Sequence, residues 1–423
     1  MRTSPLKEAT KSWIWVALFS IIIFLTVPIA RNIQSFVAKH LGKDFFIYFV
    51  SGVIILIFII IIYFLATKLR VGFISSYLWL IIITCLYLYF TLKLQKNPPE
   101  ALHFLEYGIL SFLLFRALKH DIKDKSIYVT ATLFCLLIGT LDEILQWTLP
   151  RRFWDFQDVG LNALSGGLFQ FAIWKVIRPK FISTKFNVKS LRFFSYTFAV
   201  CLIILGLCIS NTPQRVTSYI KSFPWLSFLK DEEPMSEFGY KHTNPSIGIF
   251  YSRFSLDRLR ETDSQKGKEY AQLLNNSKRT NYEQFIRKYN PTTHPFLHEL
   301  RVHVFRRDSY LKSAKTASKI DAKKESYFIA YKENLILEKY FGNTIRKSVY
   351  AWDENQIKEI EASIDKNRLY ESPVSANLFT SFSEKTVWIT ICSTISLLVF
   401  LNIILYFKEK KRKTDSYYQN NIP

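Results

Sequence analysis

The fold is decided by three hydrophobic stretches that follow one another closely: ALHFLEYGILSFLLFRAL (residues 101–118), IYVTATLFCLLIGTLDEILQWTL (127–149) and VGLNALSGGLFQFAIWKVI (159–177). Each approaches the roughly 20 apolar residues with which a helix spans a bilayer. Each also carries ionisable or amide side chains, although an ionisable residue costs about 2.5 to 3.5 kcal/mol at the bilayer centre. We therefore expect these polar residues to mark paired or functional positions.

Five other stretches have the same apolar character, so the sequence predicts eight membrane spans. The additional stretches lie at 13–30, 45–66, 73–92, 191–210 and 387–407. Lysine and arginine collect in the loop between the sixth and seventh spans and again after the eighth span. Because short positively charged segments stay in the cytoplasm, this pattern predicts that both termini are cytoplasmic.

The predicted organisation is an all-α polytopic membrane domain with an inserted, extracytoplasmic α+β domain. Residues 1–210 form seven spans, 211–384 form the inserted domain, and 385–423 form the eighth transmembrane helix with a basic cytoplasmic tail. Much of the net charge of +22 belongs to this topology pattern, so nucleic acid is not an expected partner. All five cysteines fall in predicted spans, so no disulfide is expected in the inserted domain.

The inserted domain shows both helical and strand spacing. Helices are predicted at 255–274, at 282–289 and after a capping box of Asp353 and Gln356, and strands at 300–304, 327–331 and 335–340. His298, Glu299 and His303 suggest a zinc motif, but histidines five positions apart do not share a helical face as the motif requires. A surface or core-edge role is therefore expected for these histidines.

The polar residues of the three central spans are predicted to meet at one depth near the outer membrane boundary. They are His103, Glu106 and Tyr107, then Asp142, Glu143 and Gln146, then Arg152, Asp158 and Asn162. The first three share a helical face at spacing i, i+3, i+4. The small residues at 165–167 would let the sixth span pack closely against a neighbour.

These residues resemble the VanZ-like family of bacterial membrane proteins. The resemblance rests on H-x-x-E-Y at 103–107, D-E-x-x-Q at 142–146, and Pro150, Arg152, Asp158 and Asn162, and it covers about residues 101–177. The family usually has glycine where this chain has Arg151 and Ser165. The resemblance implies a multi-pass protein of the bacterial inner membrane, in a family associated with low-level resistance to the glycopeptide teicoplanin.

Three interpretations of the polar cluster remain open at this stage. It could lock three helices together within a non-catalytic scaffold or sensor. It could bind or modify an amphiphilic envelope molecule, such as an envelope lipid or a peptidoglycan-related ligand, with Arg152 on a phosphate or carboxylate. It could belong to a transporter, although the inverted repeats expected of one are not seen.

An enzyme and a binding module would use the same residues in different ways. In an enzyme, His103 or Glu106 would be the general base, and Asp142 and Glu143 would orient it or hold a divalent cation. Tyr107, Gln146, Arg152, Asp158 and Asn162 are the binding candidates. No serine or cysteine nucleophile and no glycine-rich phosphate loop accompanies the set, so the sequence does not separate an enzyme from a binding module.

Overall fold

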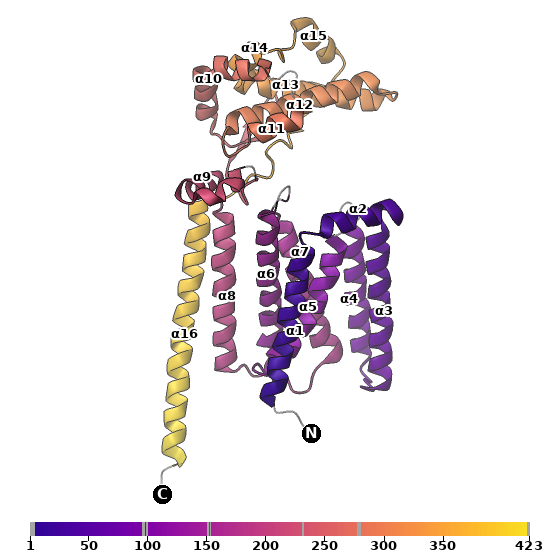
Figure 1. The fold of residues 1–423 in the computed structure, drawn as a ribbon, viewed down its shortest axis with the longest axis vertical. Helices are drawn as coiled ribbons and strands as arrows, with labels where there is room; N and C mark the ends of the chain where they lie inside the picture. The colour runs from indigo at the N-terminus through magenta and orange to yellow at the C-terminus, as the bar shows by residue number, and fades with distance from the viewer. Residues whose placement is uncertain are drawn as a thin grey trace. The chain divides into compact units, whose positions relative to one another are not determined.

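The protein is mostly helical, and its chain divides into two compact units. The computed structural model describes residues 5–94, 98, 100–149, 152, 154–230, 232–276 and 281–420. Unit 1 comprises residues 1–207 and 389–423, and unit 2 comprises residues 208–388. Figure 1 shows the helices of both units along the chain.

Unit 1 is built almost entirely of helices that run side by side (Figure 1). They are α1 (Pro5–Thr26), α2 (Ala30–His40), α3 (Phe45–Thr67), α4 (Ile74–Lys93), α5 (Glu100–Leu118), α6 (Ser126–Trp147), α7 (Phe156–Ala172), a π-helical turn (Ile173–Ile177), α8 (Val188–Ile209) and most of α16 (Glu384–Asn420). Of these, all but α2, α7 and the π-helical turn are long and apolar enough to cross a membrane, which makes seven candidate spans among the described residues. Several such helices indicate a multi-pass membrane protein.

The exception, α7, is the helix that the sequence predicted as the sixth of eight spans. It is 17 residues long and carries Asp158, Asn162 and Gln170, so it is less apolar than the others. It packs closely on α5 and α6, the two most buried of the candidate spans. A helix whose neighbours are protein rather than lipid can carry polar side chains, because each can find a partner inside the bundle.

Small residues bring α7 against its neighbours, as the sequence predicted for residues 165–167. A Cβ at Gly166 would lie 2.7 Å from the Sγ atom of Cys135 on α6. The Ser111 hydroxyl of α5 donates to the Gly166 carbonyl at 2.8 Å, and the Ser165 hydroxyl donates to the Phe104 carbonyl. The Tyr87 hydroxyl of α4 donates to the Ser165 carbonyl at 2.6 Å. Close backbone approach therefore joins three helices, α4, α5 and α6, to α7.

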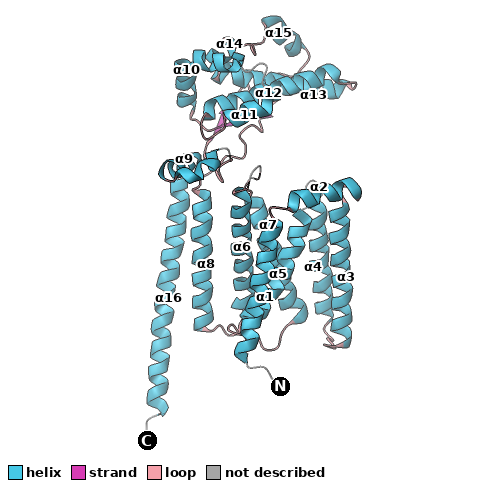
Figure 2. Cartoon of the chain, viewed as in Figure 1, coloured by secondary structure: helices cyan, strands magenta, loops and turns pink. Residues whose placement is uncertain are grey.

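Unit 2 combines helices with one small sheet, shown in magenta in Figure 2. Its elements are α9 (Pro213–Ser222), a 3₁₀ helix (Pro224–Lys230), β1 (Tyr240–Asn244), β2 (Gly248–Ser252), α10 (Leu256–Asn276), α11 (Tyr282–Lys288), α12 (Pro295–Thr316), α13 (Ile320–Tyr340), α14 (Gly342–Arg346), α15 (Glu354–Ala362) and β3 (Tyr370–Glu371). β1 and β2 form an antiparallel hairpin, and β2 pairs in parallel with β3.

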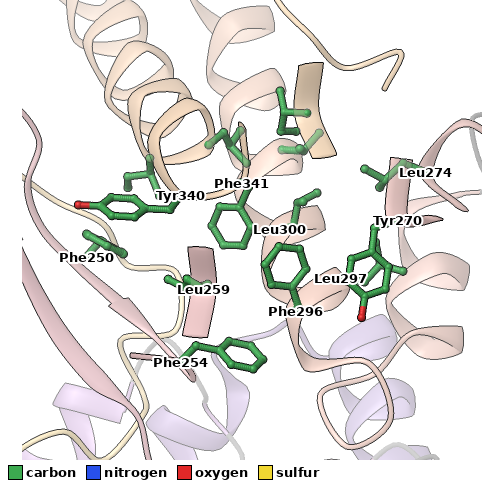
Figure 3. Packing of buried hydrophobic residues seen from close by; sticks show 14 of the residues in the cluster. Phe250, Phe254, Leu259, Tyr270, Leu274, Phe296, Leu297, Leu300, Tyr340 and Phe341 are labelled. Atoms are coloured by element: carbon green, nitrogen blue, oxygen red, sulfur yellow. The ribbon is translucent and has the colours of Figure 1, made fainter. Parts of the chain in front are cut away.

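The core of unit 2 is rich in aromatic side chains from both helices and strands. Figure 3 shows Phe250 of β2 beside Tyr340 at the end of α13, and Phe296 of α12 beside Tyr270 of α10. The ring centroids of these two pairs are 4.6 and 5.2 Å apart. α12 and α13 pack along each other and supply much of the remaining core. This unit therefore buries a hydrophobic core of its own.

Helix predictions for unit 2 are confirmed, but the strand predictions are wrong. The Asp353 side chain accepts a hydrogen bond from the Gln356 amide, as the capping box predicted. Residues 300–304 lie within α12, and residues 327–340 lie within α13, so neither a strand nor a hairpin forms there. Leu297, Leu300 and Val304 also fit helical spacing, and their burial on α12 follows that period.

Candidate functional site

The predicted polar residues gather at one end of the unit 1 helices. His103, Glu106 and Tyr107 lie in the first turns of α5, Asp142 to Gln146 lie in the last turns of α6, and Asp158 and Asn162 lie in the first turns of α7. Arg152 lies in the connection between α6 and α7. Since these three helices pack on one another, their ends bring most of the predicted set together.

Gln146 links the two acidic residues of α6 to Arg152. Its Nε2 donates to Glu143 Oε1 at 2.8 Å and more weakly to Asp142 Oδ2 at 3.5 Å. Its Oε1 accepts from Arg152 Nη1 at 3.1 Å. Arg152 Nη2 also donates to the Val27 carbonyl at 3.2 Å, just past the end of α1. The cluster therefore includes a fourth helix end that sequence reasoning missed.

His103 and Glu106 form a separate pair on the same face of α5. His103 Nδ1 lies 3.2 Å from Glu106 Oε2, and about a quarter of each side chain is exposed, 27% and 29%. The charge of His103 also interacts with those of Asp142, Glu143 and Asp158. The sequence-predicted pairing of His103 with Glu106 is thus present, and it adjoins the carboxylates of α6 and α7.

Tyr107 and Asn162 fill the space beside Gly139 of α6. A Cβ at Gly139 would lie 3.0 Å from Asn162 Cβ and 3.4 Å from Tyr107 Cε1. The Tyr107 hydroxyl donates to Asp142 Oδ2 at 3.4 Å, a long hydrogen bond. Asp158 is close enough to Glu143 for their charges to repel. Gly139 was missed, although its place three residues before Asp142 puts it on the same helical face.

Two carboxyl groups are buried in this cluster with incomplete hydrogen bonding. Asp142 is 0% exposed and Glu143 is 2% exposed. The Oδ1 atom of Asp142 has no hydrogen-bond partner among the described residues. A buried carboxylate oxygen without a donor is costly, because the charged form needs water, a cation or a hydrogen-bond donor.

A metal is not supported as the missing partner. Within the described ranges, no group of three or more His, Cys, Asp or Glu residues is arranged to hold a metal ion. The described residues therefore provide no third ligand beside Asp142 and Glu143 for the divalent cation that the sequence suggested. Pro150 and Arg151, which were used in judging the resemblance to the VanZ-like family, lie outside the described residues.

Unit 2 contains a second buried polar cluster that the sequence did not predict. Glu333 of α13 is fully buried, and its Oε1 accepts hydrogen bonds from Arg306 Nε at 3.0 Å, Tyr370 Oη at 2.6 Å and Ser372 Oγ at 2.9 Å. Its Oε2 lies 2.6 Å from His303 Nδ1. Burial alone would raise the pKa of Glu333, but the His303 charge and these hydrogen bonds lower it below its usual range.

The other two residues of the rejected zinc motif, His298 and Glu299, have structural contacts. His298 is partly buried on α12, and its Nδ1 lies 3.1 Å from the Tyr289 carbonyl. Burial, reinforced by the charge of Arg253, lowers the pKa of His298 to about 4. Glu299 Oε2 accepts from the Arg253 amide at 3.0 Å and lies 3.5 Å from Arg253 Nη1. Glu299 Oε1 has no hydrogen-bond partner among the described residues, but the Arg253 charge lies beside this carboxylate, unlike Asp142. His298 and Glu299 both lie on α12.

Comparison with known proteins adds no assignment. No family model matches the chain, and neither the curated proteins nor the solved structures include a significant match.

Proposed function

We propose that this protein is a VanZ-like membrane protein that binds an amphiphilic molecule of the bacterial cell envelope at the polar cluster of α5, α6 and α7. The observation that carries the proposal is Asp142, whose fully buried carboxylate leaves Oδ1 without a hydrogen-bond partner among the described residues. A cluster built only to fasten helices would be expected to satisfy such an oxygen, since an unsatisfied buried acceptor costs about 1 to 3 kcal/mol or more. A donor group on a ligand would satisfy it.

The residues around Asp142 suit a ligand that carries both an anionic group and hydrogen-bond donors. Arg152, with its forked donors, is the proposed contact for a phosphate or carboxylate. Asp142 and Glu143 would accept hydrogen bonds from hydroxyl, amide or ammonium groups. His103 and Glu106 are the more exposed members, and they are placed to exchange a proton if the ligand is chemically modified.

The membrane context is part of this proposal. Residues 156–177, which comprise α7 and the π-helical turn, would also span the membrane inside the bundle, as the sixth of eight spans. Both termini would then be cytoplasmic, unit 2 would be extracytoplasmic, and the polar cluster would open toward the outer leaflet of the inner membrane. The distribution of Lys and Arg supports this orientation.

Thiol labelling in intact cells tests the orientation. In a background lacking the exposed Cys85 and Cys392, Lys268→Cys of α10 should react with an impermeant thiol reagent. Lys185→Cys, in the exposed loop before α8, should react only after the cells are permeabilised. The reverse pattern would place the cluster at the inner face and overturn the proposed access from the outer leaflet.

Native mass spectrometry of the protein purified from its bacterial membrane tests the binding. We expect an additional mass that survives purification with the wild type and is lost with Asp142→Asn, a change that keeps the side-chain shape. Asp263→Asn is the matched control, because Asp263 is also buried but accepts three hydrogen bonds from Asn343 and Thr344. A wild type that carries no such mass, or one that Asp142→Asn retains, would contradict the proposal.

A further inference from the structure

A cavity separate from the polar cluster lies at the opposite ends of α5 and α6, beside the first turn of α8. Its volume is about 780 Å³, within the range of pockets that hold small ligands. Ten residues line it: Lys123, Asp124, Ser183, Lys185, Phe186, Asn187, Val188, Lys189, Lys408 and Glu409. Four of these are lysines from three different segments of the chain.

Hydrogen bonds between the loops hold the wall of this cavity in place. The Ser183 amide donates to the Lys123 carbonyl at 2.7 Å. Asp124 Oδ1 accepts from the Ser126 amide at 2.9 Å, and Asp124 Oδ2 accepts from the Asn187 amide at 2.9 Å. Asp124 thereby joins the start of α6 to the residue before α8. The loops that carry Lys123, Lys185 and Lys189 are therefore held together by hydrogen bonds.

The lysines of the cavity lack acidic partners. Within the part of the chain that the structure describes, none of the four forms an ion pair with a carboxylate. Asp124 is buried and both of its oxygens accept the hydrogen bonds named above. Glu409 lies 3.9 Å from Arg192. The Lys123 ammonium donates to the Lys119 carbonyl and lies 5.6 Å from the centre of the Phe181 ring, but neither partner neutralises its charge. Four lysines therefore line a cavity whose two carboxylates already have other partners, which favours an anion there.

The location of the cavity indicates what kind of anion would occupy it. α6 begins at Ser126, α8 begins at Val188, and the apolar part of α16 ends just before Lys408. Three candidate membrane helices thus end at the level of the lysines, where lipid headgroups would lie. Phe181 and Phe186 are 49% and 57% exposed in the same loop, so apolar rings are available beside the lysines for contact with lipid.

We propose that this cavity binds the phosphate of an anionic phospholipid headgroup, with Lys123, Lys185, Lys189 and Lys408 as its contacts. Clusters of basic residues at the membrane surface recognise anionic lipids, and the exposed phenylalanines would contact the upper part of the acyl chains. Free phosphate shares the headgroup's charge but would gain nothing from those rings. This inference does not depend on the polar cluster having the function proposed above.

Binding to full-length protein in a neutral detergent tests the inference. The probes are dioctanoyl phosphatidylglycerol, dioctanoyl phosphatidylcholine and inorganic phosphate, and the readout is the apparent Kd from the shift in thermal unfolding temperature. We expect phosphatidylglycerol to bind at least tenfold more tightly than either other probe. Replacing Lys123, Lys185 and Lys189 with Gln should weaken it on the order of 100-fold, because each lysine at an anionic surface contributes about fivefold.

Two control variants distinguish specific lipid binding in the cavity from a general effect of positive charge and from misfolding. Lys268, Lys312 and Lys315 are exposed in unit 2, and replacing these three with Gln removes the same charge without touching the cavity, so binding should be unchanged. Lys185→Gln alone, in an exposed loop, should weaken binding about fivefold even if the triple variant does not fold. Equal binding of both lipids, phosphate binding as tight as phosphatidylglycerol, or unchanged binding by Lys185→Gln would overturn the inference.

Discussion

Glu333 in unit 2 and Asp142 in unit 1 are both fully buried carboxylates, but their surroundings differ. Both oxygens of Glu333 have partners, and two of these, His303 and Arg306, can carry positive charge. Within the part of the chain that the structure describes, Asp142 has only long hydrogen bonds, from Tyr107 at 3.4 Å and Gln146 at 3.5 Å, and these reach one of its two oxygens. The hydrogen bonding of Glu333 is that of a structural residue, whereas the incomplete hydrogen bonding of Asp142 is that expected of a ligand-binding residue.

The difference shows that burial alone does not distinguish a structural acid from a functional one. Buried carboxylates that are paired and hydrogen-bonded contribute to a unique fold, and removal of one partner leaves the other charge uncompensated. The Glu333 cluster itself retains one unsatisfied atom, His303 Nε2. The difference from Asp142 is that both oxygens of Glu333 itself have partners.

The largest stability effect is expected at Glu333. Glu333→Gln should lower the free energy of unfolding of unit 2 by about 3 kcal/mol or more, because it leaves His303 and Arg306 without their counter-charge. Hydrogen exchange of α12 and α13 in the full-length protein measures this. Glu325→Gln on the same helix is the control, since its ion pair with Arg368 is exposed and should contribute less than about 1 kcal/mol. Equal effects of the two substitutions would remove the basis of the comparison.

A second test uses pH and concerns His298. Because its pKa in the folded protein is about 4 and its usual value is 6.5, the unfolded state binds more protons between these values. The stability of unit 2 should therefore fall, by up to about 3 kcal/mol, as pH is lowered from 6.5 to 4. His298→Asn, which can still donate to the Tyr289 carbonyl, should remove most of this slope in denaturant unfolding. Glu333 would affect the pH dependence of stability only below about pH 4.5, because its pKa in the folded protein is lowered from that usual value. A variant with the wild-type slope would refute the assigned protonation of His298.

A smaller effect is expected where the unit 1 cluster touches Gly139. Gly139→Ala would place a methyl group 3.0 Å from Asn162 Cβ, so we expect a loss of about 1 kcal/mol relative to Gly160→Ala. Gly160 has no neighbour within 4 Å of an added Cβ, and alanine there should stabilise α7 by up to about 1 kcal/mol through helix propensity. Thermal unfolding in detergent compares the two. Equal stability of both variants would mean that Asn162 and Tyr107 are loosely held, and that the cluster is not preorganised.

The sequence predicted the unit 1 helices well because bilayer-spanning apolar runs are long and uninterrupted. It also predicted the helices that begin at Ser255 and Asp353, where side-chain caps mark the start. The alternation over residues 300–304 was misleading, because Leu300 and Val304 lie on one face of a helix as readily as on one face of a strand. The hairpin of β1 and β2 was missed although Asn244-Pro245 provides a turn signal between its strands.

The polar cluster could be predicted as a set because its members stand at helical spacing near helix ends. Its contact with the Val27 carbonyl could not, since a backbone acceptor at the end of α1 leaves no side-chain pattern. The Glu333 cluster was also out of reach, because His303, Glu333 and Tyr370 are separated by 30 and 37 residues. Which helix faces meet over such distances depends on packing that one sequence does not reveal.

Asp142→Asn provides the most direct test of the claim that the unit 1 cluster is a binding site rather than a fastening. The measurement is the thermal stability of the ligand-free protein in detergent, alongside the mass co-purified from the native membrane. We predict a stability within about 1 kcal/mol of the wild type, or higher, because a poorly satisfied buried charge is removed, together with loss of the co-purified mass. A loss of about 3 kcal/mol, comparable to that of Glu333→Gln, with the co-purified mass unchanged, would show that Asp142 fastens the helices and would contradict the account.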